Sequence, residues 1–176
     1  LRRATIVWAG GRYQAAAEDL QRSAELYRAA GNSLQAVFAE GNLGLVYYSM
    51  SRYAEAETLM LAAIRAAEET NARYRLVSDL GDLSVVYIAL GRMSLAYDYA
   101  DRMVKLATEL GNNAELSRGR GNRAYALLGL GRYEEALADL EFILDLYRRQ
   151  ERIEGMIVTT IDLIIYLRGI GDEEQA

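Results

Sequence analysis

The stretch that decides the fold reads GNLGLVYYSMSRYAEAE from Gly41 to Glu57, and a related stretch, GNRAYALLGLGRYEEALADL, runs from Gly121 to Leu140. A spacing of forty residues recurs along the whole chain, with alanine at Ala16, Ala56, Ala96, Ala136 and Ala176 and arginine at Arg12, Arg52, Arg92 and Arg132. A period of this length is typical of one supersecondary unit stacked on copies of itself. We therefore expect a repeat fold in which one copy predicts the rest.

Each copy predicts two helices. Apolar side chains recur three, four and seven residues after Leu43, and a second apolar stripe begins at Tyr53. This is the periodicity of amphipathic helices. In this copy we expect the first helix over 33–50 and the second over 53–70. The sequence thus predicts an all-α chain, a right-handed α-solenoid of stacked antiparallel helix pairs.

Small residues recur where these helices should stop. After the first helix of each pair stand Gly11, Ser51, Gly91, Gly131 and Gly171, and after the second stand Gly31, Asn71 and Gly111. Glycine and asparagine tolerate the left-handed conformation that closes a helix, so their recurrence supports two helices per copy. Glu151 breaks the second series, and we expect an irregular turn there.

Small residues inside the helices predict close packing. Gly44, Ser84 and Ala124 share one register in the first helices, and Ala56, Ala96 and Ala136 share another in the second helices. Arg123 departs from the pattern, because it stands in the register of Leu43 and Leu83, which favours a packed position. The register leaves the exposure of Arg123 open.

Composition excludes several classes of function. The chain is 52% hydrophobic and 26% charged, which is ordinary for a globular domain. It holds no cysteine and no histidine, which argues against transition-metal sites and rules out Ser-His-Asp triads, Cys-His pairs and a histidine general base. No GxxxxGK[ST] loop occurs, and adjacent carboxylates such as Glu134 and Glu135 point in different directions on a helix. We expect no enzyme activity and no cofactor.

The net charge and the hydropathy pattern limit the classes of partner that this chain is expected to bind. The net charge of −5 argues against a nucleic-acid binder. No apolar stretch reaches the roughly 18 residues of a membrane span, so we expect no membrane partner. The lack of cysteine agrees with a cytoplasmic protein.

The recurring small and aromatic residues of the repeat resemble a known family signature. The small residue at Gly44, the aromatic at Tyr47, the Gly-Arg-Tyr turn at 131–133 and the alanine at Ala136 resemble the signature of tetratricopeptide repeats. The common repeat has 34 residues and a closing proline, whereas the repeat of this chain has forty residues and no proline. The longer form is similar to the arrays of kinesin light chains and spindle-orientation adaptors, and to the sensor arrays of bacterial STAND regulators and CHAT-domain proteases. We expect one array over 1–176, cut from a longer chain, with repeats at about 1–32, 33–72, 73–112 and 113–152 and a partial copy at 153–176.

The resemblance implies a candidate site. In the forty-residue family the residue after the initial glycine faces a concave groove and holds the backbone of a bound peptide; here that register holds Arg2, Asn42, Asp82, Asn122 and Asp162. Three and six residues further along are Leu45, Val85 and Tyr125, then Tyr48, Ile88 and Leu128, with Trp8 in the first copy. The alternatives are that Asn and Asp cap helices and that the aromatic stripe is core. Tyr13, Tyr53 and Tyr133, at the start of the second helices, are expected to pack.

Two arginine clusters complete the candidates. The clusters are Arg118, Arg120 and Arg123, and Arg148, Arg149 and Arg152. Arginine clusters bind carboxylates and phosphates, so an acidic partner is one interpretation; a solvated face offset by Glu134, Glu135, Asp139 and Asp145 is the other.

Three hypotheses for function follow. The first is a scaffold that binds a peptide or helix of a partner protein in the groove. The second is a sensor or regulatory array of a multidomain signalling enzyme, an ATPase, protease or cyclase. The third is self-association through uncapped ends of the array.

Overall fold

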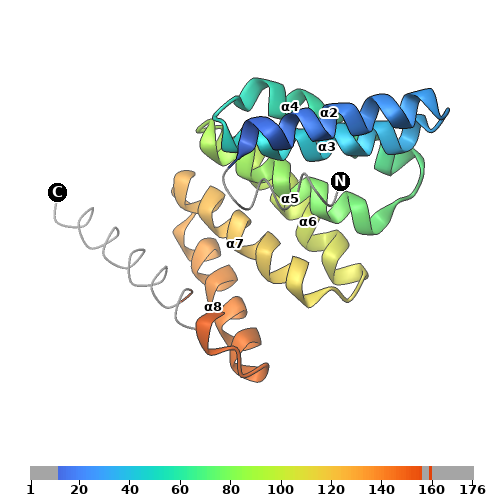
Figure 1. The fold of residues 1–176 in the computed structure, drawn as a ribbon. Coiled ribbons are helices and arrows are strands. Elements are labelled where there is room, and N and C mark those ends of the chain that lie inside the picture. The colour runs from blue at the N-terminus through green and yellow to red at the C-terminus, as the bar shows by residue number, and fades with distance from the viewer. Residues whose placement is uncertain (1–11, 156–158, 160–176) are drawn as a thin grey trace. The chain divides into compact units, whose positions relative to one another are not determined.

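The structure is a computed structural model, and it describes residues 12–155 and 159 (Figure 1). All regular secondary structure in these residues is helical. The helices are α2 (Tyr13–Ala29), α3 (Ser33–Ser49), α4 (Tyr53–Glu69), α5 (Arg73–Ala89), α6 (Met93–Glu109), α7 (Asn113–Gly129) and α8 (Tyr133–Arg149). The expected helices over 33–50 and 53–70 are confirmed to within one residue, and the all-α fold of helix pairs is confirmed.

The turns explain why the helices stop where they do. Gly31, Gly91, Gly111 and Gly131 take φ between 62° and 72°, and Ser51 and Asn71 take 59° and 51°. After the turns at Gly31, Ser51, Asn71, Gly111 and Gly131 an amide N–H returns to a carbonyl five residues earlier, as in Arg52 N to Tyr47 O at 2.8 Å. This bond closes the helix end in the Schellman manner. The predicted stop positions are confirmed, except Gly11 and Gly171, which lie outside the described residues.

The turn after α8 is regular, so the expectation of an irregular turn at Glu151 was wrong. Glu151 takes φ of 54°, and the N–H of Arg152 donates to Tyr147 O at 3.0 Å. These are the features of the other turns. The glutamate adopts the left-handed conformation at a steric cost that glycine does not have, because the bonds of the turn require it.

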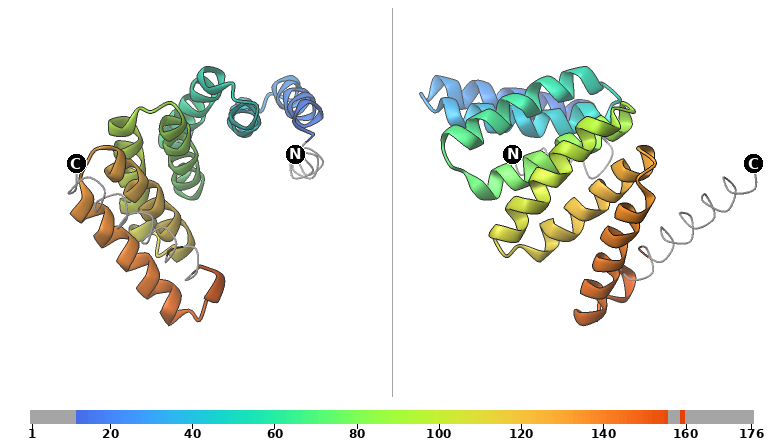
Figure 2. Two further views of the ribbon diagram at one scale, coloured as in Figure 1. Left: turned by 90° about the vertical axis from the view of Figure 1, so that its left-hand side faces the viewer. Right: turned by 180° about the vertical axis from the view of Figure 1, so that it is seen from behind.

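The contacts within the chain divide it into two compact units, which we call unit 1 (Leu1–Gly91) and unit 2 (Arg92–Ala176). In unit 1 each helix from α2 to α5 packs against the next, and α3 also contacts α5. In unit 2, α6 packs against α7 and α7 against α8. Tight turns make consecutive helices within a unit antiparallel (Figures 1 and 2).

The core of unit 1 depends on small residues. A Cβ on Gly44 of α3 would lie 3.0 Å from Met60 Cγ and 3.2 Å from the carbonyl oxygen of Ala56, both on α4. A Cβ on Gly41 would lie 2.7 Å from Ala63 Cβ. The expected close approach at Gly44 is therefore confirmed, because any side chain there would push the two helices apart.

Unit 2 repeats this arrangement with other residues. Ala124 of α7 forms a buried cluster with Leu127, Ala136 and Leu140, and Tyr97 and Leu128 pack against it. Ala124 occupies the register of Gly44, and Ala136 is fully buried. The alanine series thus lies where α7 and α8 meet.

Candidate partner-binding face

The predicted polar residues lie inside helices, not at their ends. Asn42 is in the middle of α3 and Asp82 in the middle of α5, and both are half-buried. The N-cap of α3 is Asn32, whose side chain accepts a hydrogen bond from Gln35 N at 3.2 Å. In unit 2 the N-cap of α7 is Asn112, and Asn122 is half-buried within the helix. The capping alternative is therefore wrong for Asn42, Asp82 and Asn122.

The residues three positions further along share the face of these polar residues. Leu45 and Val85 are half-buried, and Tyr125 is 57% exposed. A spacing of three residues places the side chains side by side on a helix surface. Each of the helices α3, α5 and α7 therefore carries one polar and one apolar side chain that are adjacent to each other and are not fully buried.

The series six positions further along is turned toward the second helices. The ring of Tyr48 packs against that of Tyr53 with centroids 5.8 Å apart, and Leu128 packs on the core of unit 2. Ile88 is half-buried. The structure therefore favours packing for Tyr48 and Leu128, and the expected packing of Tyr53 is confirmed. Tyr13 and Tyr133 are half-buried.

Sequence reasoning missed residues on the same face. Leu34 and Phe38 lie eight and four residues before Asn42, and Tyr74, eight before Asp82, is 71% exposed. Extending the helical spacing of four residues backward from Asn42 and from Asp82 would have found them. We call this surface of unit 1 the ladder face; it consists of Leu34, Phe38, Asn42 and Leu45 on α3 and Tyr74, Ser78, Asp82 and Val85 on α5.

An arginine joins the two helices of the ladder face. Arg75 Nε lies 2.8 Å from each carboxylate oxygen of Asp79, and its Nη2 donates to the carbonyl oxygen of Phe38 at 3.3 Å. The guanidinium also lies 5.0 Å from the centre of the Phe38 ring. Asp79 is buried, so its charge needs this partner. The pair fixes α5 against α3 beside Phe38.

In unit 2 the corresponding residues lie on α7. Arg118, Asn122 and Tyr125 are spaced four and three residues apart, which places them on one side of the helix. Arg118 donates to Glu115 at 2.8 and 2.9 Å, and its side chain is 35% exposed. Trp8 and Asp162, which the sequence also put on this surface, lie outside the described residues, as does Arg2.

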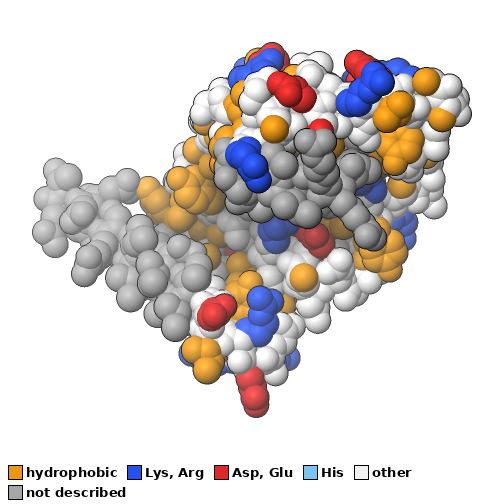
Figure 3. Space-filling view, in the orientation of Figure 1, with side chains coloured by type: hydrophobic (Ala, Val, Ile, Leu, Met, Phe, Trp, Pro, Cys, Tyr) orange, Lys and Arg blue, Asp and Glu red, His pale blue; other side chains and the backbone are white. Residues whose placement is uncertain are grey.

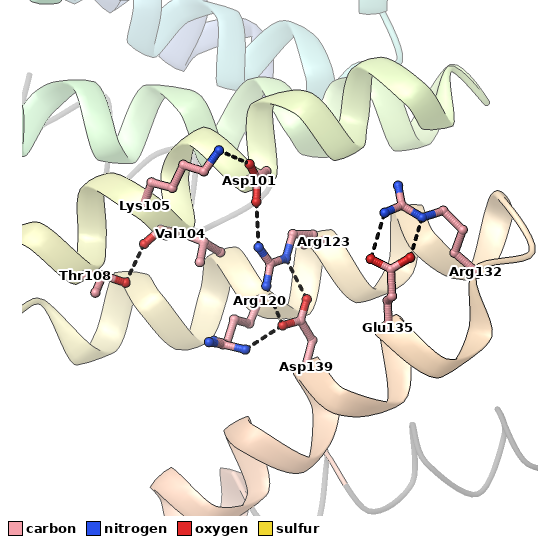
Figure 4. A network of polar contacts seen from close by, with 9 residues as sticks. All are labelled: Asp101, Val104, Lys105, Thr108, Arg120, Arg123, Arg132, Glu135 and Asp139. Carbon is pink, nitrogen blue, oxygen red and sulfur yellow. Dashed lines mark hydrogen bonds and ion pairs between the residues drawn. The ribbon is translucent and has the colours of Figure 1, made fainter.

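The first arginine cluster is neither an open basic patch nor a solvated face. Arg123 bonds Asp101 of α6 at 2.6 Å and Asp139 of α8 at 2.7 Å, and Arg120 bonds Asp139 at 2.6 Å (Figure 4). The side chain of Arg123 is 19% exposed and that of Asp139 only 2%. Both guanidiniums are therefore used within the chain. The question that the register left open is answered: Arg123 is packed and charge-paired.

These contacts shift the ionisation of the cluster. The hydrogen bond to Asp139 raises the pKa of Arg123 above its usual range, against the effect of burial. For Asp101, burial raises the pKa, but hydrogen bonds from Lys105 and Arg123 outweigh it, so the pKa is lowered. Both groups are thus held in their charged forms.

Two arginines of the second cluster make contacts within the chain. Arg149 pairs with Asp145 at 2.5 Å, and Arg152 lies over the ring of Tyr147 at 5.0 Å. On the side of the molecule in Figure 3, basic and acidic side chains are interspersed. In residues 12–155 no helix is long and apolar enough to cross a membrane, and across this described part no three His, Cys, Asp or Glu side chains are placed to hold a metal ion.

Comparison with known proteins gives a family match. Residues 1–69 match the model of a tetratricopeptide repeat family. Regulatory protein AfsR of Streptomyces coelicolor is 32% identical over 114 residues, which is 65% of this chain and 12% of that protein. The chain therefore spans only a small part of this curated relative.

Solved structures share the fold. The crystal structure of a putative kinesin light chain with nearly identical TPR-like repeats, from Podosopora anserina, superimposes with a TM-score of 0.82 at 16% identity, covering 99% of this chain and 86% of that one. BtubC (BKLC) from P. vanneervenii gives 0.73 at 18% identity, covering 88% and 61%. Aspartyl phosphate phosphatase F from Bacillus subtilis gives 0.73 at 12% identity, covering 97% and 50%. At these identities the likeness shows the fold alone.

Proposed function

We propose that this chain is a protein-interaction scaffold that binds a peptide or helix of a partner protein on the first helices of its pairs. The match of residues 1–69 to a tetratricopeptide repeat model supports this proposal. The observation that carries the proposal is the ladder face of unit 1. There α3 and α5 contact each other, and each presents one polar side chain in mid-helix, Asn42 or Asp82, next to apolar side chains outside the core.

The chemistry of this face fits a peptide. Amide and carboxylate groups one repeat apart pair with successive N–H and C=O groups of a ligand backbone without demanding a sequence. Leu45, Val85 and the exposed ring of Tyr74 offer apolar area for ligand side chains, and aromatic residues are enriched where interfaces gain most of their affinity. In unit 2, α7 carries its own set of such side chains, Arg118, Asn122 and Tyr125.

Selection from a random peptide library tests the proposal. Peptides enriched on the wild-type protein would be titrated by calorimetry against the variants Asn42→Ala, Asp82→Ala and Leu45→Asp. We expect each to weaken binding about tenfold, the loss of roughly 1.4 kcal/mol, with a thermal midpoint close to that of the wild type. The matched control is Arg65→Ala, on the exposed side of α4. Equal binding by all four variants would place the ligand elsewhere.

A second candidate function is regulation within a larger protein. The observation in its favour is the match to a regulatory protein, AfsR, that is much longer than this chain. In this role the ladder face senses a partner and transmits binding to other domains. Binding of a selected peptide that leaves the activity of the full-length protein unchanged would count against it.

A further inference from the structure

The middle of α7 lacks the apolar side chains that anchor the equivalent helix of unit 1. In α5 three large apolar residues are buried, and forty residues later the same register of α7 is polar or charged. The corresponding pairs are Val77 and Ser117, Leu80 and Arg120, and Leu83 and Arg123. Helices in proteins are stabilised chiefly by packing of their apolar face, so this part of α7 needs another source of stability.

The same segment is also a poor helix former. It reads SRGRGNR from Ser117 to Arg123, with two glycines, a serine and an asparagine. Packing explains Gly119, because a Cβ there would lie 3.1 Å from Val104 Cγ2. Packing does not explain Gly121, where the nearest heavy atom to an added Cβ is Ile143 Cδ1 at 4.0 Å. Gly121 therefore weakens the helix without a steric reason.

An ionic cluster takes the place of the apolar anchors. Asp139 of α8 accepts from Arg123 Nε and Nη2 at 2.7 Å and from Arg120 Nη1 at 2.6 Å, and Arg123 Nη1 donates to Asp101 at 2.6 Å (Figure 4). Lys105 pairs with the other oxygen of Asp101 at 2.7 Å. The guanidinium of Arg120 also lies 3.8 Å from the centre of the Phe142 ring.

One buried carboxylate thus holds two arginines of α7. Removing one partner of a buried ion pair leaves an uncompensated charge, which is far more costly than losing an exposed pair. Here the loss of Asp139 removes the carboxylate that Arg120 pairs with and leaves Arg123 with Asp101 alone. Because the segment has little else to keep it helical, we expect these arginines to turn to water and the helix to open around them.

We propose that Ser117–Arg123 is a conditionally ordered segment, helical while Asp139 holds Arg120 and Arg123 and locally unfolded when they are released. The two ends of α7 stay in place in both states, because Leu116 and Leu127 are buried. Arg118 and Asn122 lie in this segment. If the proposed function is correct, the folding of Ser117–Arg123 also determines whether these two residues are positioned to bind a ligand. The folding of the segment does not depend on that function.

Hydrogen exchange of the wild-type protein, followed by mass spectrometry, gives the first test. Residues 77–83 of α5 are the internal reference, because they occupy the same register with apolar anchors. We expect protection factors at 117–123 to be at least tenfold lower than at 77–83, with the amides around Leu127 well protected. Equal protection of the two segments would overturn the proposal.

Substitutions then test the cause. We expect Asp139→Asn to lower protection at 117–123 by a further tenfold or more. The control is Glu135→Gln, which removes the exposed pair with Arg132 on the same helix and should change nothing at 117–123. Loss of protection spread evenly over α6, α7 and α8 would show that the cluster stabilises unit 2 as a whole, and the proposal would be wrong.

A third variant remains informative if Asp139→Asn does not fold. The triple variant Arg120→Leu, Arg123→Leu and Asp139→Leu introduces the apolar residues of earlier copies. Leu80 and Leu83 stand one period before the two arginines, and Leu59 stands two periods before Asp139. We expect the protection of this variant at 117–123 to rise to the level of 77–83. Protection no higher than in the wild type would show that the ionic cluster is not what makes the segment weak.

Discussion

At the scale of single residues, the helical glycines of this chain differ in what they do. A Cβ on Gly41 would collide with Ala63 and Arg75, whereas a Cβ on Gly121 would meet Ile143 Cδ1 at an unstrained 4.0 Å. We expect Gly121→Ala to stabilise the protein by about 0.5–1 kcal/mol, the difference in helix propensity. Gly41→Ala should destabilise it by roughly 1–3 kcal/mol through overpacking. Urea denaturation followed by circular dichroism measures both, and a stabilising Gly41→Ala would contradict the packing.

Residues in the left-handed region give a second prediction. Glu151 takes φ of 54°, a conformation that costs a residue with a Cβ roughly 1 kcal/mol, and glycine stands in the corresponding turns at Gly31 and Gly111. Glu151→Gly is therefore expected to stabilise unit 2 by up to about 1 kcal/mol, measured as the urea midpoint. Gly111→Ala, the reverse change at the equivalent turn, should lower that midpoint. The prediction fails if both substitutions act in the same direction.

The sequence predicts features that depend on neighbouring residues better than features that depend on contacts between helices. Helix ends depend on neighbours in sequence, so glycine and asparagine predicted five of the described turns, and Ser51 in the same register predicted a sixth. Glu151 was missed because its conformation is imposed by hydrogen bonds, not by its own preference. The pairing of Arg123 with Asp101 and Asp139 was missed because it joins three helices. The forty-residue register placed Arg123 at a position that favours packing, but no pattern within one helix predicts which residues of other helices it contacts.

At the scale of the helices, the ionic cluster makes the association of α6 with α7 depend on pH. The pKa of Asp101 is lowered in the folded protein, so its charged form stabilises the fold above the unfolded pKa of about 4. That stability is lost as the pH falls below 4 toward the folded pKa. We expect Asp101→Asn to be less stable than the wild type at pH 6 and to lose less stability between pH 4 and pH 3. Parallel pH profiles of the two proteins in urea denaturation would contradict this.

Within the candidate site, the sequence predicted which side chains share a helix face, but it did not predict which side chains contact a neighbouring helix. Helical spacing and the forty-residue register placed Asn42 and Leu45 of α3, and Asp82 and Val85 of α5, on one face of each helix. None of these four residues is among the buried core residues. The ring of Tyr48 lies against Tyr53 because the turn at Ser51 brings the next helix back over it. Predicting that contact requires the geometry of the turn, which spacing within one helix does not contain.

At the scale of the whole molecule, stability in a chain of stacked repeats is a sum of local terms, and here the contacts gather in two units. Met60 is 2% exposed in unit 1, and Leu140 is 5% exposed in unit 2. Either residue changed to alanine should cost about 2–5 kcal/mol in its own unit. We expect Met60→Ala to speed hydrogen exchange in α2 to α5 while leaving α7 and α8 unchanged, and Leu140→Ala to do the reverse. Exchange that rises along the whole chain in either variant would mean that the two units unfold as one cooperative body, and sites on one unit would then be coupled to events on the other.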